Sequence, residues 1–578
     1  MKIQFKLPSL LLCMLFLSTV VSAQYKQTIA NKTQLLFNKN KIIPLGRLDD
    51  LKIAVAVSSE EKYSAFVEQL ERYADVAVID LSQLNEQGKL YNTIIVAGTA
   101  SDLAMTNAAL LNQAVSNNKN IILCKFLDTQ VSRIQNIAQF GGKVTELVSA
   151  EFSAEAQRNV AMSIFGGLGI TEGNTKLKTS QTRLQYSEGI GSGLDLPKMT
   201  QKIDAIAAEA IREKGAPGLV VMAIKNGQVI FEKAYGNHTY EANQKTTIND
   251  IFDLASVSKI AGTTPVVMHL QETNAIHLDS TMGRYLWDVR STNKKDIKLR
   301  TVLLHEAGFT PYIPFYRDLK PGDVQSFPSA THQVQLADNS YLKNNYYEEV
   351  MWPQMMNSAV KPSGNYVYSD ISMYVMKEVA EHITSIPMDE YVQQILYRPI
   401  GMKTAGYNPR TRFEKNRIIP TEHDTSFRKV LLEGFVHDQG AAMAGGVAGH
   451  AGLFASANDL AIYGQLLLNR GEYGGTRYFK ENTVDLFTSN QSKTSRRGLG
   501  FDRADPDLKK EYPSKLANTS VYGHTGYTGT CIWIDPKHQL VYIFLSNRVH
   551  PQVSTKLLNL NIRSRIQDAI YETINESK

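Results

Sequence analysis

The sequence predicts two folded parts: a parallel α/β sandwich, then a larger α+β domain with an antiparallel sheet, flanking helices and a helical subdomain. In the first part, four apolar strand-like runs alternate with helix-like stretches between residues 51 and about 150. In the second part, a helix and a hairpin stand at one end of the domain, and a second hairpin and a helix stand at the other. With 578 residues, 43% hydrophobic and 20% charged, the chain is globular and long enough for two to four domains.

The N-terminus predicts a cleaved secretory signal. A basic start, Met1–Lys6, leads into the apolar run Leu10–Val21 and the small-residue pattern Val21-Ser22-Ala23. We therefore exclude residues 1–23 from the fold and expect a periplasmic or secreted protein. No later apolar run is long enough to span a bilayer.

The charge and the cysteines exclude several classes of protein. The net charge of +6 comes without a Lys/Arg block, so a nucleic-acid partner has no support. The mature chain keeps Cys124 and Cys531, in strand-like segments of different domains, and we expect two buried free thiols. The His and Cys residues show no metal-binding spacing, so we predict no metal and no cofactor.

The first domain is predicted to hold a parallel sheet because its strand-like runs are apolar on both faces and are separated by helices. The runs are Lys52–Val57, Val76–Asp80, Thr93–Ala97 and Asn120–Cys124, and the helix-like stretches include Glu60–Tyr73 and Leu103–Val115. Gly98-Thr99 and Gly141-Gly142 are isolated turns, and no G-x-G-x-x-G or G-K-[ST] motif is present. Nucleotide binding therefore has no local support.

Two segments of this part carry a resemblance. Asn31–Leu45 resembles the entry to the second domain of family 3 glycoside hydrolases, and Ala161–Gly167 is similar to that domain's last helix. The family's nucleophilic aspartate belongs to a preceding barrel that is missing here, so the resemblance does not imply glycosidase activity. It implies a retained structural or binding domain over residues 24–171.

The second domain begins after a predicted linker. Residues 172–197 are polar and rich in glycine, which is typical of linkers. Met199–Glu213 then predicts an amphipathic helix, and Asn226-Gly227 predicts a hairpin between Leu219–Ile224 and Val229–Tyr235.

The end of the chain has a matching pattern. It predicts a hairpin from Cys531–Asp535 and Leu540–Leu545, then a helix over Val553–Ile574. We therefore expect one sheet built from both ends of residues 198–578. The aromatic, proline-rich stretch Lys294–Ser363 is either a lid over a cleft or a packed surface loop.

Ser256 is the leading candidate nucleophile. It stands at the start of a predicted helix, where free backbone N–H groups and the helix dipole favour developing negative charge. Lys259 lies on the same helical face, and a serine with a lysine can form an activated oxygen nucleophile. The spacing alone is weak, because it recurs at Ser59/Lys62, Ser116/Lys119, Ser291/Lys294, Ser340/Lys343, Ser358/Lys361 and Ser426/Lys429.

Two later motifs distinguish Ser256 from the other matches. Tyr368-Ser369-Asp370 and His524-Thr525-Gly526 follow Ser256/Lys259 in that order. The set resembles the serine β-lactamase and penicillin-binding-protein superfamily, in particular its class C and D-alanyl-D-alanine carboxypeptidase-like branch. Supporting segments are Pro217–Val221, Leu303–Gly308 and Gly446–Phe454.

The resemblance implies a role for each residue. Ser256 attacks a carbonyl, Lys259 accepts the serine proton once its pKa is lowered, and Tyr368 relays a proton to the leaving group or to water. The backbone N–H groups of Ser256 and Tyr527 form an oxyanion hole. The strand residues His524, Thr525 and Gly526 line the binding site of a substrate carboxylate.

Two positions depart from the family pattern. Asp370 replaces the usual asparagine, and an ionised carboxylate cannot donate to a substrate carbonyl. His524 replaces the usual lysine, so we expect affinity for an anionic substrate to weaken as the pH rises past the His524 pKa. His305-Glu306-Ala307-Gly308 departs from His-Thr-Ser-Gly, and His450 is interpreted as a loop histidine with local hydrogen bonds.

The sequence thus predicts an exported serine hydrolase that forms an acyl-enzyme on Ser256. Its favoured substrate is an amide or ester in cell-wall-derived peptides or related small molecules. Two alternatives stay open: an esterase like those of family VIII, and a catalytically idle binder of cell-wall glycopeptide.

Overall fold

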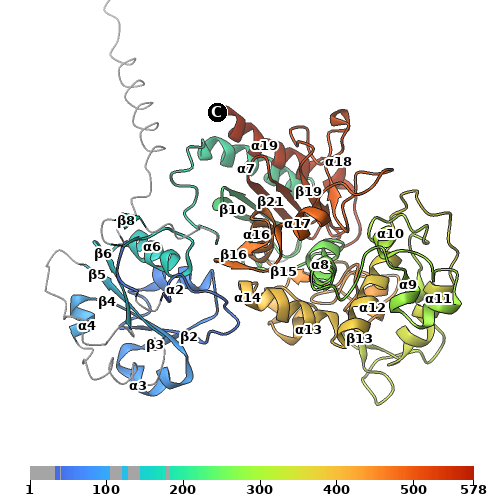
Figure 1. Ribbon diagram of the computed structural model, residues 1–578, viewed down its shortest axis with the longest axis horizontal. Coiled ribbons are helices and arrows are strands. Elements are labelled where there is room, and N and C mark those ends of the chain that lie inside the picture. The colour runs from blue at the N-terminus through green and yellow to red at the C-terminus, as the bar shows by residue number, and fades with distance from the viewer. Residues whose placement is uncertain are drawn as a thin grey trace, which may run out of the picture.

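The computed structural model describes residues 33–38, 41–104, 120–127, 144–172, 175–176, 183–241 and 243–577 (Figure 1). The predicted signal peptide, most of the predicted helix Leu103–Val115 and the Gly141-Gly142 turn lie outside these residues. The described residues form two large sheets, one in each of two parts of the molecule that Figure 1 shows side by side, and three small sheets of two or three strands. No described helix has the length and apolar character needed to cross a membrane.

The first part is built on an eight-stranded sheet with the order β3-β2-β4-β5-β6-β1-β7-β8. Its strands are β1 (Thr33–Phe37), β2 (Ile53–Val57), β3 (Val76–Asp80), β4 (Thr93–Thr99), β5 (Asn120–Phe126), β6 (Val144–Ser149), β7 (Thr171–Glu172) and β8 (Thr175–Lys176). Its helices are α2 (Ser64–Glu71), α3 (Leu84–Gln87), α4 (Ala100–Ala104) and α6 (Ala154–Phe165). The four predicted strands pair in parallel, as expected, while β1 pairs antiparallel with β6. Strands β2 and β4 are buried along their whole length, which explains their continuous apolar sequence.

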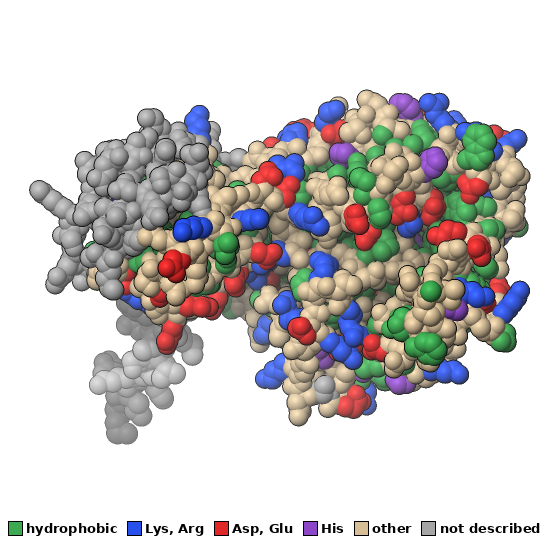
Figure 2. Space-filling view, turned by 90° about the horizontal axis from the view of Figure 1, so that it is seen from below, with side chains coloured by type: hydrophobic (Ala, Val, Ile, Leu, Met, Phe, Trp, Pro, Cys, Tyr) green, Lys and Arg blue, Asp and Glu red, His purple; other side chains and the backbone are tan. Residues whose placement is uncertain are grey.

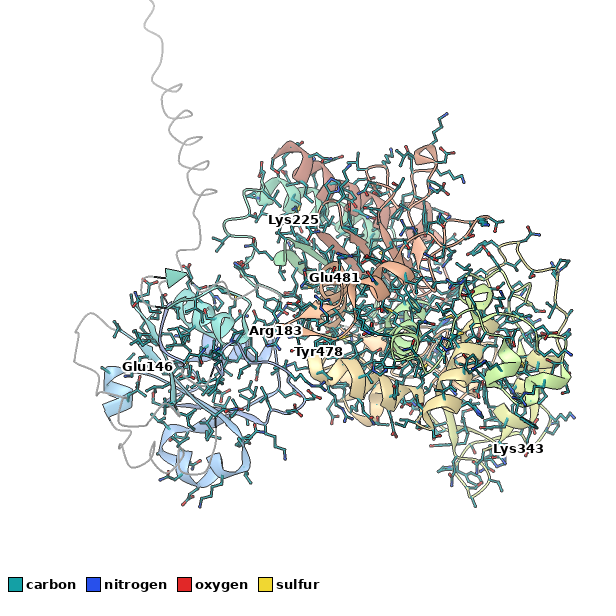
Figure 3. The ribbon with its side chains drawn as sticks, viewed as in Figure 1. Glu146, Arg183, Lys225, Lys343, Tyr478 and Glu481 are labelled. Atoms are coloured by element: carbon teal, nitrogen blue, oxygen red, sulfur yellow. The ribbon has the colours of Figure 1, made fainter. Side chains whose placement is uncertain are left out.

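The described end of the predicted linker is packed between the two parts. Arg183 is fully buried, and it donates to the carbonyls of Leu45 at 2.8 Å and Phe165 at 3.2 Å (Figure 3). Across the same junction, Arg72 pairs with Glu232 at 2.8 Å. Leu184 links the two parts, because its carbonyl accepts from the Tyr73 hydroxyl of the first part at 2.6 Å and its N–H donates to the Tyr473 hydroxyl of the second at 3.4 Å.

The second part holds a six-stranded antiparallel sheet with the order β10-β9-β21-β20-β19-β18. Its strands are β9 (Gly218–Lys225), β10 (Gln228–Gly236), β18 (Asp502–Arg503), β19 (Tyr522–Thr525), β20 (Cys531–Asp535) and β21 (Leu540–Ser546). The sheet thus joins both ends of the domain, as predicted. Asn226 and Gly227 have φ angles of 53° and 79°, the left-handed values that a two-residue type I′ hairpin requires.

Helices cover both faces of this sheet. Strand alternation sends Trp533 and Tyr542 toward α7 (Leu196–Arg212) and α19 (Ile562–Glu576), and sends Ile532 and Val541 toward α16 (Ala457–Leu468). The predicted final helix is broken into α18 (Lys556–Asn559) and α19, because Asn561 adopts a left-handed φ of 51°.

The remaining helices and small strands form a subdomain beside the sheet. They are β11 (Phe252–Asp253), α8 (Thr264–Glu272), α9 (Met282–Tyr285), α10 (Leu299–Leu303), β12 (Val324–Gln325), β13 (Val334–Ala337), β14 (Ser340–Leu342), α11 (Trp352–Asn357), α12 (Ile371–Thr384), α13 (Met388–Val392), α14 (Arg398–Ile400), α15 (Gln439–Met443), β15 (Phe454–Ala455), β16 (Glu472–Tyr473), β17 (Thr476–Arg477) and α17 (Glu481–Thr488). The predicted fold class is confirmed. Cys124 and Cys531 are buried free thiols, as expected.

On the face in Figure 2, basic and acidic side chains are intermingled.

Candidate active site

The chain turns sharply just before Ser256. The Asp253 carboxylate at the end of β11 accepts the backbone N–H of Ala255 at 2.8 Å and that of His437 at 2.7 Å. These bonds hold Ala255 at a φ of 46°, a conformation that a non-glycine residue rarely adopts. The helix begins at Val257, so Ser256 stands partly exposed at its N-terminal end.

Lys259 lies one turn further along, and its ammonium is fully buried. It donates to Ser256 Oγ at 3.1 Å, to Asp370 Oδ1 at 2.9 Å and to the backbone carbonyl of His450 at 3.2 Å. It sits in a short π-helical stretch, Lys259–Thr263, which widens the helix next to the candidate nucleophile.

The charge state of Lys259 differs from the prediction. Burial acts to lower the pKa of Lys259, but the nearby Asp370 carboxylate and the Tyr368 hydroxyl outweigh burial and raise it. The expectation of a lowered lysine pKa is therefore wrong. Its physical reason is Asp370, which supplies a negative charge where the family's asparagine has none.

Tyr368 lies between two cations and a neutral histidine. Lys259 Nζ is 4.9 Å and the Arg497 guanidinium carbon is 5.4 Å from the centre of the Tyr368 ring. The His305 ring packs against the tyrosine at 4.6 Å, and His305 Nδ1 accepts the backbone N–H of Ser369 at 3.2 Å. Burial and the neighbouring cations hold the pKa of His305 well below its usual value.

His524 is neutral in this site. Its Nδ1 lies 2.7 Å from the Thr525 carbonyl and its Nε2 lies 3.3 Å from Arg497. The carbonyl can only accept and the guanidinium can only donate, so Nδ1 carries the proton. Burial and the charge of Arg497 lower the pKa of His524 to about 3. The expectation of a histidine that is partly cationic near neutral pH is therefore wrong.

Arg497 supplies a positive charge next to His524 that does not depend on pH. The sequence motifs did not predict this residue. Its side chain is buried and donates to the Tyr366 hydroxyl at 2.8 Å. Asp502 lies 3.7 Å away and partly balances the charge. The only sequence signal is the pair Arg496-Arg497 upstream of the His524 strand.

The loop after β19 is anchored beside the candidate nucleophile. Thr528 Oγ1 donates to the Asp253 carbonyl at 2.7 Å, and Thr530 Oγ1 donates to the Leu254 carbonyl at 3.0 Å. Within the described residues, neither the Ser256 nor the Tyr527 backbone N–H has a hydrogen-bond acceptor. Both donors are therefore available to an oxyanion.

His450 lies closer to the site than its sequence context indicates. Its Nε2 is 2.9 Å from Asp438 Oδ1, and its carbonyl contacts Lys259. One side-chain atom each of Asp370, Asp438 and His450 lie within 4.8 Å of one another. Asp438 and His450 are 12 residues apart, but Asp370 is far from both along the chain, so no spacing rule could have found this cluster.

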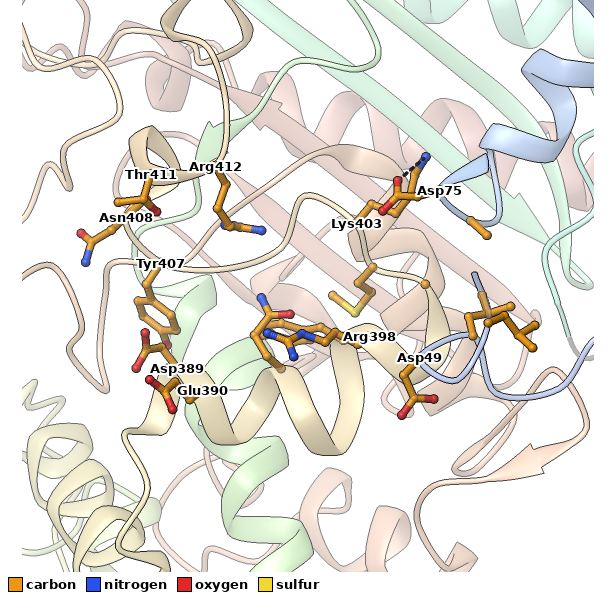
Figure 4. A pocket seen from close by; sticks show the side chains of 17 residues that line it. Asp49, Asp75, Asp389, Glu390, Arg398, Lys403, Tyr407, Asn408, Thr411 and Arg412 are labelled. Atoms are coloured by element: carbon orange, nitrogen blue, oxygen red, sulfur yellow. Dashed lines mark hydrogen bonds and ion pairs between the residues drawn. The ribbon is translucent and has the colours of Figure 1, made fainter. Parts of the chain in front are cut away.

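A separate cavity of about 640 Å³ lies at the junction of the two parts (Figure 4). It is lined from the first part by Asp49 and Asp75 and from the second by residues that include Arg398, Tyr407 and Arg412. None of the predicted site residues lines it.

A serine next to a buried lysine, at the start of a helix and facing a strand of an antiparallel sheet, defines a class of serine hydrolases. The chain belongs to the beta-lactamase family, whose profile matches residues 203–566. It is an enzyme of the serine hydrolase superfamily that includes the β-lactamases and penicillin-binding proteins.

Curated relatives match most of their own length. A protein of Escherichia coli K12 with the provisional name D-alanyl-D-alanine carboxypeptidase is 27% identical over 395 residues, which cover 64% of this chain and 87% of the relative. A protein of Salmonella paratyphi A with the same provisional name is 29% identical over 375 residues, covering 61% and 83%.

Two solved structures are similar at the level of the fold. The octameric penicillin-binding protein homologue from Pyrococcus abyssi has a TM-score of 0.49 and 18% identity, covering 65% of this chain and 78% of that one. A class C beta-lactamase from Rhodobacter sphaeroides has a TM-score of 0.47 and 16% identity, covering 64% and 99%.

Proposed function

We propose that this chain is an exported serine hydrolase that cleaves an amide or ester in cell-wall-derived peptides through an acyl-enzyme on Ser256. The observation that carries the proposal is the 3.1 Å contact between Ser256 Oγ and Lys259 Nζ at the end of the sharp turn. This distance permits direct proton transfer between a nucleophile and its base. The relatives' provisional name supports a peptide substrate.

The steps follow from the positions of the groups. The fraction of Lys259 that has lost its proton to solvent takes the proton of Ser256 as Oγ forms a bond to the substrate carbonyl carbon, and the Asp370 carboxylate keeps this fraction small near neutral pH. The oxyanion accepts hydrogen bonds from the N–H groups of Ser256 and Tyr527. Collapse of the intermediate expels the leaving group, which takes its proton through Tyr368, and water then hydrolyses the ester bond to Ser256.

The position of Asp370 supports esterase activity as a second candidate function. Its carboxylate is bound to Lys259 and cannot donate to an amide carbonyl of the substrate. A substrate with a better leaving group depends less on that donor. Short-chain esters and D-alanyl peptides therefore distinguish the two enzymatic functions by their relative kcat/KM.

A fluorophosphonate probe and a fluorescent penicillin test the nucleophile. We expect wild type to be labelled and Ser256→Ala to be unlabelled. The matched control is Ser340→Ala, which removes a serine with the same spacing to a lysine; Lys343 there pairs with Asp323 at 2.8 Å instead. Equal labelling of wild type and Ser256→Ala would refute the assignment, and labelling of neither protein would favour the idle glycopeptide binder.

A further inference from the structure

Three residues from different segments bring their side chains together next to Lys259. Asp370 precedes α12, Asp438 caps α15, and His450 lies in the loop that follows. Their possible ligand atoms lie within 4.8 Å of one another. Donors around a tetrahedral metal ion with bonds of about 2.0–2.2 Å lie about 3.4 Å apart, which falls inside this limit.

In each of the two carboxylates, Asp370 and Asp438, only one oxygen atom takes part in a hydrogen bond or ion pair. Asp370 Oδ1 accepts from Lys259, while Asp438 Oδ1 accepts the Ala441 N–H at 2.7 Å and contacts His450 Nε2. Within the described residues, no hydrogen bond or ion pair involves Oδ2 of either aspartate. Each carboxylate therefore keeps one oxygen free for a further partner.

A buried hydroxyl beside the cluster provides a second, independent observation. Tyr374 is 2% exposed, and its hydroxyl has no hydrogen-bond partner among the described residues. Its ring lies 4.5 Å from the His450 ring, and a Cβ added at Gly440 would lie 2.7 Å from the Tyr374 hydroxyl and 3.4 Å from Asp438 Oδ1, so the hydroxyl lies beside the cluster. The cluster thus has a buried hydroxyl beside it that could bond to a water held by a bound ion.

We propose that Asp370, Asp438 and His450 bind one divalent transition-metal ion next to Ser256, with Zn²⁺ the best match. Two carboxylate oxygens and one imidazole nitrogen are a donor set that suits Zn²⁺, whereas Mg²⁺ and Ca²⁺ prefer oxygen donors alone. Binding through His450 Nε2 replaces its contact with Asp438 Oδ1 and places the ring proton on Nδ1, a buried atom with no hydrogen-bond partner among the described residues.

The local charge and the exposure fit a cation. The Asp370 and Asp438 carboxylates both lie beside the nucleophile, where Asp370 pairs with Lys259 and Asp438 pairs with His450. The Asp370 and Asp438 side chains are 22% and 24% exposed, so the ion has a route from solvent and an open position for water. Lys259 keeps its bond to Asp370 Oδ1, because the ion uses Oδ2.

The experiment measures metal on the full chain, independently of activity. The protein is stripped with a chelator, titrated with ZnCl₂ by calorimetry, and loaded with Co²⁺ for visible absorption. We expect one Zn²⁺ per chain, with affinity at least about tenfold weaker in Asp438→Asn and in His450→Gln, which also lose the Co²⁺ bands. The matched control is His538→Gln, since His538 forms a similar pair with Asp535 at 2.7 Å away from the cluster.

Two outcomes overturn the proposal. If Zn²⁺ binds equally well to wild type, Asp438→Asn and His450→Gln, the binding is adventitious; if no binding occurs, water fills the space by Tyr374. Asp370→Asn is a third ligand variant, so the test does not depend on any one substitution. Circular dichroism checks that each variant is folded. Ser256→Ala should keep its metal, so a failed nucleophile assignment and a failed metal site give different results.

Discussion

Lys259 Nζ and Asp370 Oδ1 lie 2.9 Å apart, and this ion pair determines the charge of Lys259, the residue next to the candidate nucleophile. Lys259 must be neutral to take the serine proton, but Asp370 raises the pKa of Lys259 and holds it as an ammonium. The residue that departs from the family's tyrosine motif is thus in direct contact with the candidate base.

Asp370→Asn should change the pH dependence of hydrolysis. Removing the carboxylate lowers the pKa of Lys259, so the rising limb of kcat/KM moves to lower pH. Activity at neutral pH then rises about tenfold for each pH unit by which the limb moves. Ester hydrolysis measured across the pH range checks this, and Asp389→Asn, in the distant cavity, serves as the control. An unmoved limb in Asp370→Asn would show that Lys259 does not act as the base.

His524 should make the protein less stable as the pH falls. Its pKa is about 3 in the folded protein and about 6.5 when unfolded, so the unfolded chain binds the extra proton between these values. The contribution is complete above pH 6.5 and is lost toward pH 3, by up to about 1.4 kcal/mol per pH unit. Urea unfolding at pH 7 and pH 5 should show a loss about 2 kcal/mol smaller in His524→Gln than in wild type. Equal losses would contradict a neutral His524.

Arg497 should set affinity for an anionic substrate. Because its guanidinium stays charged at every accessible pH, KM for a carboxylate substrate should be constant from about pH 5 to 8. Arg497→Gln should raise that KM by roughly tenfold to a hundredfold, the loss expected for a hydrogen bond to a charged group. Arg496→Gln is the control, since Arg496 pairs with Asp502 at 2.8 Å. An inflection in KM near pH 6.5 would instead support His524 as the residue whose charge binds the anionic substrate.

Gly526→Ala should lower kcat and also destabilise the folded protein, because one of the groups that the new Cβ meets is the Leu254 backbone. A Cβ at this position would lie 2.1 Å from Thr530 Oγ1 and 2.4 Å from the Leu254 carbonyl, so the loop that carries the Tyr527 N–H must move away from Ser256. Misplacing an oxyanion donor costs about 10²–10³ in kcat. Gly46→Ala, where a Cβ meets nothing within 4 Å, should leave kcat unchanged. Wild-type kcat in Gly526→Ala would exclude this loop from the oxyanion site.

Local sequence patterns predicted helices and strands well where a pattern is compatible with only one kind of structure. The runs of apolar residues that became β2 and β4 can only be buried on both faces, and Asn226-Gly227 favours the left-handed angles of its hairpin. The packing of Arg183 was missed because its partner Leu45 lies far away along the chain, and the break at Asn561 was missed although asparagine adopts left-handed angles more readily than most residues.

The sequence by itself determined the fold class, the sheet built from both ends of the second domain, and the order of the Ser256, Tyr368 and His524 motifs. Only the tertiary structure decided the charges at those motifs. Asp370 raises the pKa of Lys259, while burial and Arg497 keep His524 neutral. The physical reason is that a side chain's pKa depends on burial and on charges within a few ångströms, and folding brings those charges from positions far along the chain.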